Sequence, residues 1–246
     1  MFGFIIAMIS LTSFAQNDVL FEQGKSFYKQ DKYIEAIEQW KKILDKKVHS
    51  ADLYFNLANA HYKLNNVAPS IYFYEKALRL SPNDSEIKNN LAFAQNMTID
   101  IIEPLPKTVF AKWYNTVSGV MEFNGWAITS ITFVVLFVLL FLAYYFSFSE
   151  RKKRFLFLGF IIAFIGIIIS LVFAFYTYSD FKNDRPAIIF SESIDVQNSP
   201  TKNGEVSFTL HEGTKVQVTN KEDNWFRIKL IDGKDGWIPE ESLKEL

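Results

Sequence analysis

The sequence of 246 residues contains no cysteine and only three histidines. Without cysteine the chain can form no disulfide, and it offers no thiolate to a metal ion or to a covalent mechanism. His49, His61 and His211 do not fall at H-E-x-x-H or other metal-binding spacing. We expect His61 to pack inside a helical repeat and His211 to be solvated before a turn, so the sequence predicts no metal site.

Net charge and catalytic motifs are scarce as well. The chain has 26 Lys and Arg against 27 Asp and Glu, a net charge of −1, which gives no electrostatic reason to expect a nucleic-acid partner. It has no glycine-rich phosphate loop, G-x-S-x-G elbow or dinucleotide fingerprint. Glu240 and Glu241 are interpreted as charged surface. The sequence therefore predicts a protein that is not an enzyme and needs no cofactor.

Charged residues are missing altogether between Phe123 and Ser149 and again between Phe155 and Ser179. The apolar runs inside these stretches, 126–146 and 155–176, would each form a helix of roughly 30 Å, the thickness of a bilayer's hydrocarbon core. We predict a transmembrane hairpin, in preference to two buried helices of a soluble protein. Because neither run contains an ionisable residue, we do not expect transport.

The segment 147–154 between the two runs supplies an orientation signal. Its positive charges are Arg151, Lys152, Lys153 and Arg154. Positive charge in a short loop is held on the cytoplasmic side of a membrane, while Trp126 and Tyr178 would lie at the opposite interface. Both soluble ends are therefore predicted outside the cytoplasm.

A stripe of small residues recurs in the second run at steps of three and four. It consists of Gly159, Ala163, Gly166, Ser170 and Ala174. Such a face lets another membrane helix approach closely. Either the first helix of the hairpin or a different protein could fill it.

The first fifteen residues are apolar from Phe2 and end in Ser13-Phe14-Ala15. Fourteen residues span only about 21 Å as a helix, which is short for a membrane crossing. The small-x-Ala ending predicts a signal peptide over 1–15, although no Lys or Arg precedes the apolar region. The alternative is an apolar N-terminus that is not cleaved.

A pattern with a period of 34 residues runs through residues 17–84, with Gly24 equivalent to Ala58 and Tyr28 to Tyr62. The period and the small residues resemble the helix–turn–helix of the tetratricopeptide family. The resemblance covers about 17–98, with repeats at 17–50 and 51–84. The helix predicted over 85–98 would cap the open apolar end of the stack.

The tetratricopeptide resemblance implies a concave groove that binds a peptide or another protein. By the family's pattern the groove residues would be Phe21, Lys25, Tyr28, Lys29, Phe55, Asn59, Tyr62 and Lys63. The alternative is that the tyrosines pack between helices and the lysines are solvated. The segment 99–125 then follows, with prolines that favour an extended linker and an amphipathic helix over Val109–Phe123 that would lie at the membrane interface.

After Tyr178 the pattern changes to short alternating runs, such as Lys215–Val218 and Trp225–Leu230, with turns at Gly213 and 232–236. About five such strands suggest a small barrel. The spacing of Gly213, Trp225 and Gly236-Trp237 resembles a bacterial SH3-type domain over 187–246. Such domains often bind cell-wall or other peptides, so Trp225 and Trp237 are candidate ligand residues, although we expect at least one of them in the core.

The whole order resembles the tetratricopeptide members of the Bacteroides aerotolerance (Bat) group. The expected fold is a multidomain membrane protein with an all-α repeat domain, a two-helix transmembrane hairpin and a small all-β SH3-like barrel. The resemblance implies von Willebrand A-domain membrane proteins and a MoxR-type ATPase system as partners. It also implies a role in aerotolerance or envelope-protein assembly.

From these parts we expect a scaffold that crosses the bacterial inner membrane twice and holds both soluble domains in the periplasm, where they bind partner proteins. One alternative is a protein that binds peptidoglycan peptides through the SH3-type domain. Another is a transmembrane sensor, but the short cytoplasmic segment 147–154 leaves little chain to carry its output.

Overall fold

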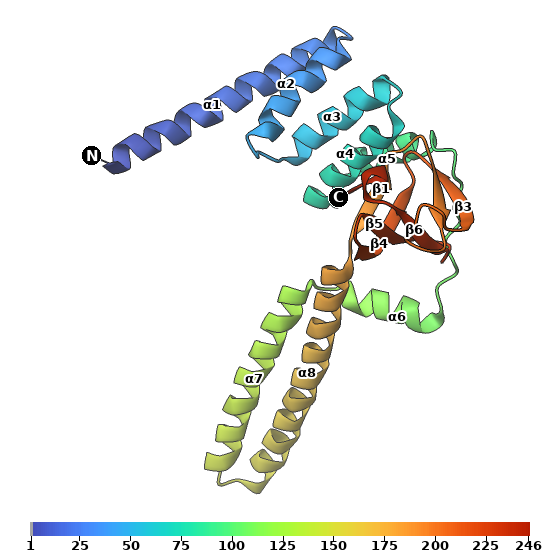
Figure 1. The fold of residues 1–246 in the computed structure, drawn as a ribbon. Helices are drawn as coiled ribbons and strands as arrows, with labels where there is room; N and C mark the ends of the chain where they lie inside the picture. Colours follow the sequence, from blue (N-terminus) through green and yellow to red (C-terminus); the bar gives the residue numbers. More distant parts are fainter. Residues whose placement is uncertain (1) are drawn as a thin grey trace. The chain divides into compact units, whose positions relative to one another are not determined.

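The computed structural model describes the backbone from residue 2 and the side chains from Gln16 onward, so the predicted signal peptide lies outside the residues whose side chains are described. The chain divides into two compact units (Figure 1). Unit 1 joins the chain up to Pro104 with Arg185–Leu246, and unit 2 is the intervening Leu105–Asp184.

Unit 1 begins with a series of helices that pack on their neighbours in chain order. They are α1 (Phe2–Lys29), α2 (Tyr33–Asp45), α3 (Ala51–Lys63), α4 (Val67–Leu80) and α5 (Ser85–Gln95). The turns after α1 and α3 contain Asp31 and Asn65, both with positive φ. Asp and Asn tolerate the left-handed conformation better than most residues, which explains the tight reversal at the same place in each repeat.

Small residues determine how closely these helices approach. An added Cβ at Gly24 of α1 would lie 2.2 Å from Nε1 of Trp40 on α2, so only glycine fits there. Ala58 and Ala77 are fully buried where α3 meets α4 and α5. The tetratricopeptide spacing of small residues is thus explained by close helix packing.

The barrel of unit 1 is a single antiparallel sheet in the order β3-β2-β6-β5-β4-β1-β7. Its strands are β1 (Pro186–Ile189), β2 (Ser193–Gln197), β3 (Val206–His211), β4 (Lys215–Glu222), β5 (Trp225–Lys229), β6 (Asp235–Pro239) and β7 (Leu243–Glu245). The 7-stranded sheet exceeds the predicted number of strands. Strand β1 was missed because all its residues are buried, so it lacks the alternation of a strand with one wet face.

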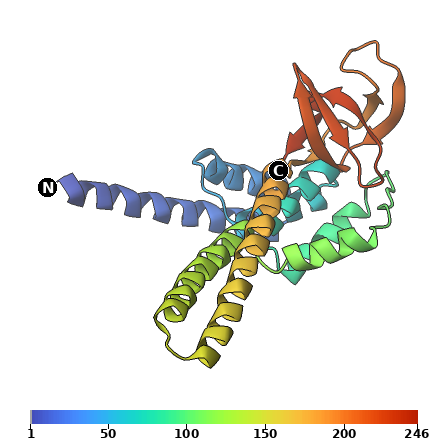
Figure 2. The ribbon, with the colours of Figure 1, turned by 90° about the horizontal axis from the view of Figure 1, so that it is seen from below.

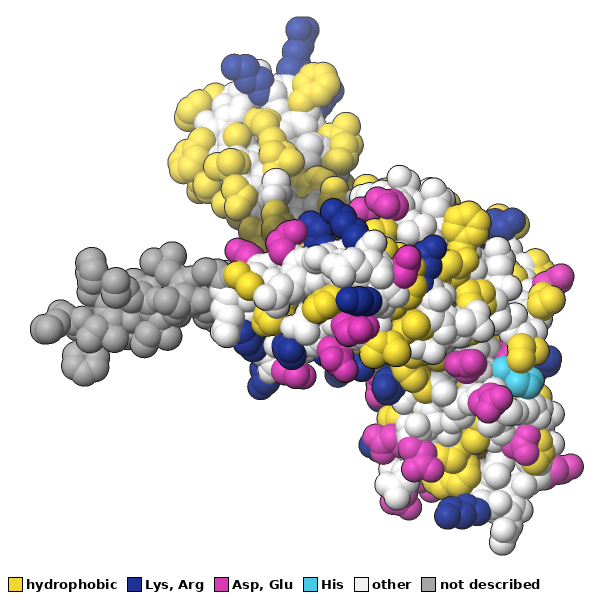
Figure 3. Space-filling model, turned by 90° about the horizontal axis from the view of Figure 1, so that it is seen from above, with side chains coloured by type: hydrophobic (Ala, Val, Ile, Leu, Met, Phe, Trp, Pro, Cys, Tyr) yellow, Lys and Arg dark blue, Asp and Glu magenta, His cyan; other side chains and the backbone are white. Residues whose placement is uncertain are grey.

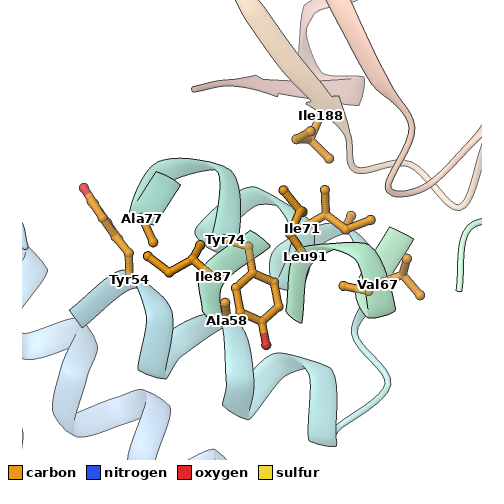
Figure 4. Close-up of a cluster of buried hydrophobic side chains, with 11 residues drawn as sticks. Tyr54, Ala58, Val67, Ile71, Tyr74, Ala77, Ile87, Leu91 and Ile188 are labelled. Atoms are coloured by element: carbon orange, nitrogen blue, oxygen red, sulfur yellow. The ribbon is translucent and has the colours of Figure 1, made fainter. Parts of the chain in front are cut away.

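Strand β1 is buried on both faces because it packs between the barrel and the helices. Ala187 and Ile189 belong to the barrel core, whereas Ile188 points into the cluster formed by α3, α4 and α5 (Figure 4). An added Cβ at Gly213 would lie 2.8 Å from Val67 of α4. The end of the repeat stack is therefore covered by α5 and the barrel together, and not by the capping helix alone.

Unit 2 contains α6 (Val109–Ser118), α7 (Phe123–Phe146) and α8 (Glu150–Asn183). Helices α7 and α8 lie side by side as a hairpin, and α6 runs across one end of it (Figures 1 and 2). The four basic residues predicted in a loop belong to the first turns of α8, so the connection is only Ser147–Ser149. The apolar run shows only which part of the helix can lie in hydrocarbon. Lys and Arg are good helix formers, so the helix extends beyond the apolar run.

Helices α7 and α8 are long and apolar enough to cross a membrane. Along them the buried residues are Ser130, Ala163, Ser170 and Phe173. Hydrophobic side chains dominate the visible face of the hairpin, with Lys and Arg at its tip (Figure 3). The hairpin is thus a pair of candidate membrane spans.

Candidate functional site

A cavity of about 260 Å³ lies in the groove of the helical repeats. The residues that line it are Tyr28, Asn59, Tyr62, Lys63, Tyr74, Asn90 and Phe93. Tyr28, Asn59, Tyr62 and Lys63 are predicted groove residues, and the fold brings them together from α1 and α3.

Asn59 is the centre of the hydrogen-bond network in this cavity. Its Oδ1 accepts from the Tyr74 hydroxyl and, at 3.2 Å, from Nδ2 of Asn90, which ties α3 to α4 and α5. Burial raises the pKa of the Tyr74 hydroxyl, so this donor stays protonated. Asn59 also lines the cavity, where its Nδ2 group is a donor that can reach a ligand.

The other predicted groove residues have other surroundings. Phe21 packs against Trp40 with ring centroids 6.4 Å apart, and its carbonyl accepts from the Trp40 indole. Lys25 pairs with Glu22 at 2.9 Å. Phe55 packs on Tyr74 at 6.0 Å, and Lys29 is exposed.

Sequence reasoning missed Tyr74, Asn90 and Phe93 as lining residues. Helix α5 was interpreted only as a cap, yet its Asn90 and Phe93 face the cavity. The 34-residue period could have predicted Phe93, because it stands at the position equivalent to Asn59.

The barrel presents its two candidate tryptophans on one face. In the β5–β6 ladder Arg227 lies opposite Trp237, and Trp225, two residues before Arg227, lies opposite Pro239. Because side chains alternate across a strand, these residues share the face opposite the core residue Phe226. Trp237 is buried and Trp225 half-buried, so an indole surface borders a guanidinium group.

A polar junction joins the segment after α5 to the barrel. Asp100 accepts from the backbone N–H of His211 at 2.7 Å, from its Nδ1 at 2.8 Å and from the Thr214 hydroxyl at 2.6 Å. These hydrogen bonds hold the pKa of Asp100 below its usual value although burial opposes them. His211, which was predicted to be solvated, is only partly exposed and is held by Asp100.

One further contact strengthens the junction. Glu75 of α4 is buried and pairs with Lys215 of β4 at 2.8 Å. A cavity of about 790 Å³ lies beside the junction, between Gln95–Ile102 and the strands β4 and β5. None of the residues that line it was predicted as a site residue.

The small-residue stripe of α8 lies against α7. An added Cβ would lie 3.3 Å from Leu140 at Gly159 and 2.8 Å from Phe133 at Gly166. The basic residues 151–154 are exposed, and Nζ of Lys153 lies 5.9 Å from the Tyr144 ring centroid. No cluster of potential metal ligands occurs among the described residues.

Comparison with known proteins identifies both soluble domains. A family model for the bacterial SH3 domain matches residues 195–245, one for the tetratricopeptide repeat matches 51–84, and a further TPR-repeat model matches 24–65. The chain contains tetratricopeptide repeats and a bacterial SH3 domain. Both predictions are thereby confirmed.

Among solved structures, the chain is similar to the NMR structure of the first TPR domain of the human RPAP3 protein. The sequence identity is 24%, the match covers 33% of this chain and 91% of that one, and the TM-score is 0.24. A search of curated proteins found no match.

Proposed function

We propose that this chain is a membrane-anchored scaffold without catalytic activity, whose tetratricopeptide groove binds a segment of a partner protein. The observation that supports this proposal is the groove cavity, which Tyr28, Asn59, Tyr62 and Lys63 line with polar groups. Tetratricopeptide and SH3 domains generally bind peptides or proteins, which supports a binding role.

The chemistry of the cavity favours a ligand segment that carries carboxylates. Nδ2 of Asn59 and Nζ of Lys63 are donors, and the hydroxyls of Tyr28 and Tyr62 can donate as well. None of the residues that line the cavity has a carboxylate. An acidic side chain or a C-terminal carboxylate would therefore find donors and a positive charge among the lining residues.

Anchoring by the hairpin is supported by the exposed apolar surfaces of α7 and α8. With the basic residues 151–154 on the cytoplasmic side, both connections to unit 1 would leave the membrane on the other side. We propose a two-pass protein of the bacterial inner membrane, with unit 1 in the periplasm. Export by a signal peptide over residues 1–15 would agree with this orientation.

The order of domains is also that of the BatE proteins of the Bacteroides aerotolerance group. On this resemblance we propose that the partners are von Willebrand A-domain membrane proteins and a MoxR-type ATPase system. The scaffold would then serve envelope-protein assembly or oxidative-stress tolerance. Since the chain has no cysteine, it would not itself perform thiol redox chemistry.

A second candidate function is binding of peptidoglycan peptides by the bacterial SH3 domain. It is favoured by the face that carries Trp225, Arg227 and Trp237. Beside it, Oε1 of Gln197 is buried without a hydrogen-bond partner, and Gln197 lies opposite Trp237. An acceptor without a partner can accept from an amide donor of a ligand.

The two functions are separated by capturing the tagged full chain from its native membrane after mild crosslinking. Lys63→Glu combined with Asn59→Ala should abolish recovery of a defined set of proteins. Lys88→Glu, with the same charge change on an exposed lysine outside the cavity, should leave it unchanged. Equal recovery from all variants would reject the groove. Loss of peptidoglycan sedimentation in Trp225→Ala would then favour the second function.

A further inference from the structure

Helix α6 carries apolar side chains that the rest of the protein leaves exposed. Val109 is 81% exposed, Phe110 84% and Trp113 60%. Val120 and Met121, just beyond the helix, are also exposed. A group of large exposed apolar side chains marks a surface that meets something apolar.

The side of α6 that carries Trp113 and Tyr114 is attached to the hairpin, since both rings lie against Phe173. The Tyr114 ring stacks on Phe173 with centroids 6.3 Å apart, and its hydroxyl donates to Oδ2 of Asp180 at 2.6 Å. The Trp126 indole donates to the carbonyl of Ser118 at 3.4 Å. These contacts fix the rotation of α6 about its axis and still leave Val109, Phe110 and most of Trp113 exposed.

The surroundings of α6 are those of a membrane interface. Trp126, Tyr176 and Tyr178 lie at the same end of the hairpin, and Trp and Tyr concentrate where hydrocarbon meets lipid headgroups. The apolar face of α6 therefore continues the exposed apolar surface of α7 and α8.

The charged residues near α6 also favour a lipid bilayer as the partner of its apolar side. The segment from Pro104 to Met121 contains Lys107 and Lys112 and no acidic residue. Lysine beside an exposed apolar face matches the phosphates of phospholipids, which lie next to the acyl chains. A protein partner would need a complementary surface, whereas a bilayer offers both groups everywhere along the helix.

We infer that α6 is a second, shallow membrane attachment that lies in the leaflet at this end of the hairpin. Phe110 and Trp113 insert among the acyl chains, and Lys112 lies beside lipid phosphates. This inference rests on the proposed membrane-spanning role of α7 and α8. Its consequence is that the chain before α6 leaves the membrane at a fixed point.

The absence of cysteine makes a direct test possible, because every introduced cysteine is unique. Nitroxide labels are placed singly at Phe110→Cys, Asn115→Cys, Ile162→Cys and Thr219→Cys of the full chain in phosphatidylcholine–phosphatidylglycerol vesicles. Each label's collision rates with oxygen and with a water-soluble nickel complex are compared. Ile162 is the control for the span, and Thr219 in the barrel is the control for water.

We expect the label at Phe110 to favour oxygen several-fold over the labels at Asn115 and Thr219, though less than the label at Ile162. Adding Lys107→Glu and Lys112→Glu should raise nickel access at Phe110 and leave Ile162 unchanged. Equal nickel access at Phe110 and Thr219, with Ile162 protected, would overturn the interfacial helix but not the spans. Protection of Phe110 from both reagents would mean a protein cover and would also overturn it. Free nickel access at Ile162 would overturn both proposals.

Discussion

Apolar side chains meet opposite surroundings in the two units. In the repeats of unit 1, Trp40, Leu57 and Ile71 are fully buried against neighbouring helices, whereas Ile162 and Leu171 of α8 in unit 2 are more than half exposed. Exposed apolar area costs roughly 25 cal/mol per Å² in water. The contrast supports the proposed anchoring of the hairpin in a bilayer.

The largest expected change in stability comes from substituting aspartate for a core isoleucine of unit 1, compared with the same substitution in α8 of unit 2. Ile71→Asp would bury a carboxylate without a partner and should destabilise unit 1 by about 3–5 kcal/mol. Ile162→Asp should leave unit 1 folded but weaken membrane retention, at a cost of about 2.5–3.5 kcal/mol for a charge at the bilayer centre. Thermal unfolding and carbonate extraction measure the two effects. Similar unfolding of unit 1 in both variants would contradict the comparison.

The second effect is a pH dependence confined to unit 1. His61 is buried against Phe73 with ring centroids 5.6 Å apart, and its Nε2 has no partner. Burial, followed by the charges of Lys41 and Lys244, lowers the pKa of His61 from 6.5 to about 4. At a pH between these two values, His61 is protonated in the unfolded chain and neutral in the folded chain. Stability should therefore fall as the pH drops from 6.5 to 4, by up to about 3 kcal/mol.

The control for this prediction is His61→Phe, which keeps an aromatic ring in the stack and removes the titrating group. Between pH 7 and pH 5 the wild type should lose about 2 kcal/mol more unfolding free energy than this variant does. An unchanged pH dependence in the variant would assign the effect to other groups.

The third prediction compares the stability cost of replacing a glycine by alanine in each of the two units. Gly24→Ala should push its Cβ into the Trp40 indole and destabilise unit 1 by about 1–3 kcal/mol. Gly159→Ala should cost less, because the Leu140 methyl group 3.3 Å away can shift slightly. Denaturant unfolding followed by tryptophan fluorescence measures the first, and helix–helix crosslinking in detergent the second. The reverse order would mean that the hairpin is the more tightly packed unit.

The smallest effect concerns the junction inside unit 1. Asp100→Asn keeps one acceptor oxygen but loses charge-assisted bonds to His211 and Thr214, which should cost about 1–2 kcal/mol. Hydrogen exchange at residues 98–102 should speed up while exchange in α2 and α3 stays unchanged. Because the folded pKa of Asp100 is lowered, acid should weaken the wild-type junction in the same way. Uniformly faster exchange would indicate general destabilisation.

The sequence predicted elements whose periodicity is strong. The 34-residue repeat and the Gly–Trp spacing of the barrel led to domain assignments that family comparison confirms. The groove was predicted less completely, because Phe21 turns toward Trp40 while Asn90 and Phe93 of α5 reach into the cavity.

The features that escaped prediction depend on contacts between distant segments. Ile188 packs on α4 and α5, and Asp100 meets His211 more than a hundred residues away, so no local pattern reveals either contact. The length of α8 was underestimated for a different reason, since its basic first turns and polar last turns are helical without being apolar.

The most direct test of the account is the sidedness of single cysteines in intact cells with a permeabilised outer membrane. Cysteines at Asn56 in α3 and Thr219 in β4 should react with a membrane-impermeant maleimide. A cysteine at Ser149, between α7 and α8, should react only after the inner membrane is opened. This result would establish two spans with unit 1 outside the cytoplasm. Equal labelling of Ser149 and Thr219 before opening would contradict it.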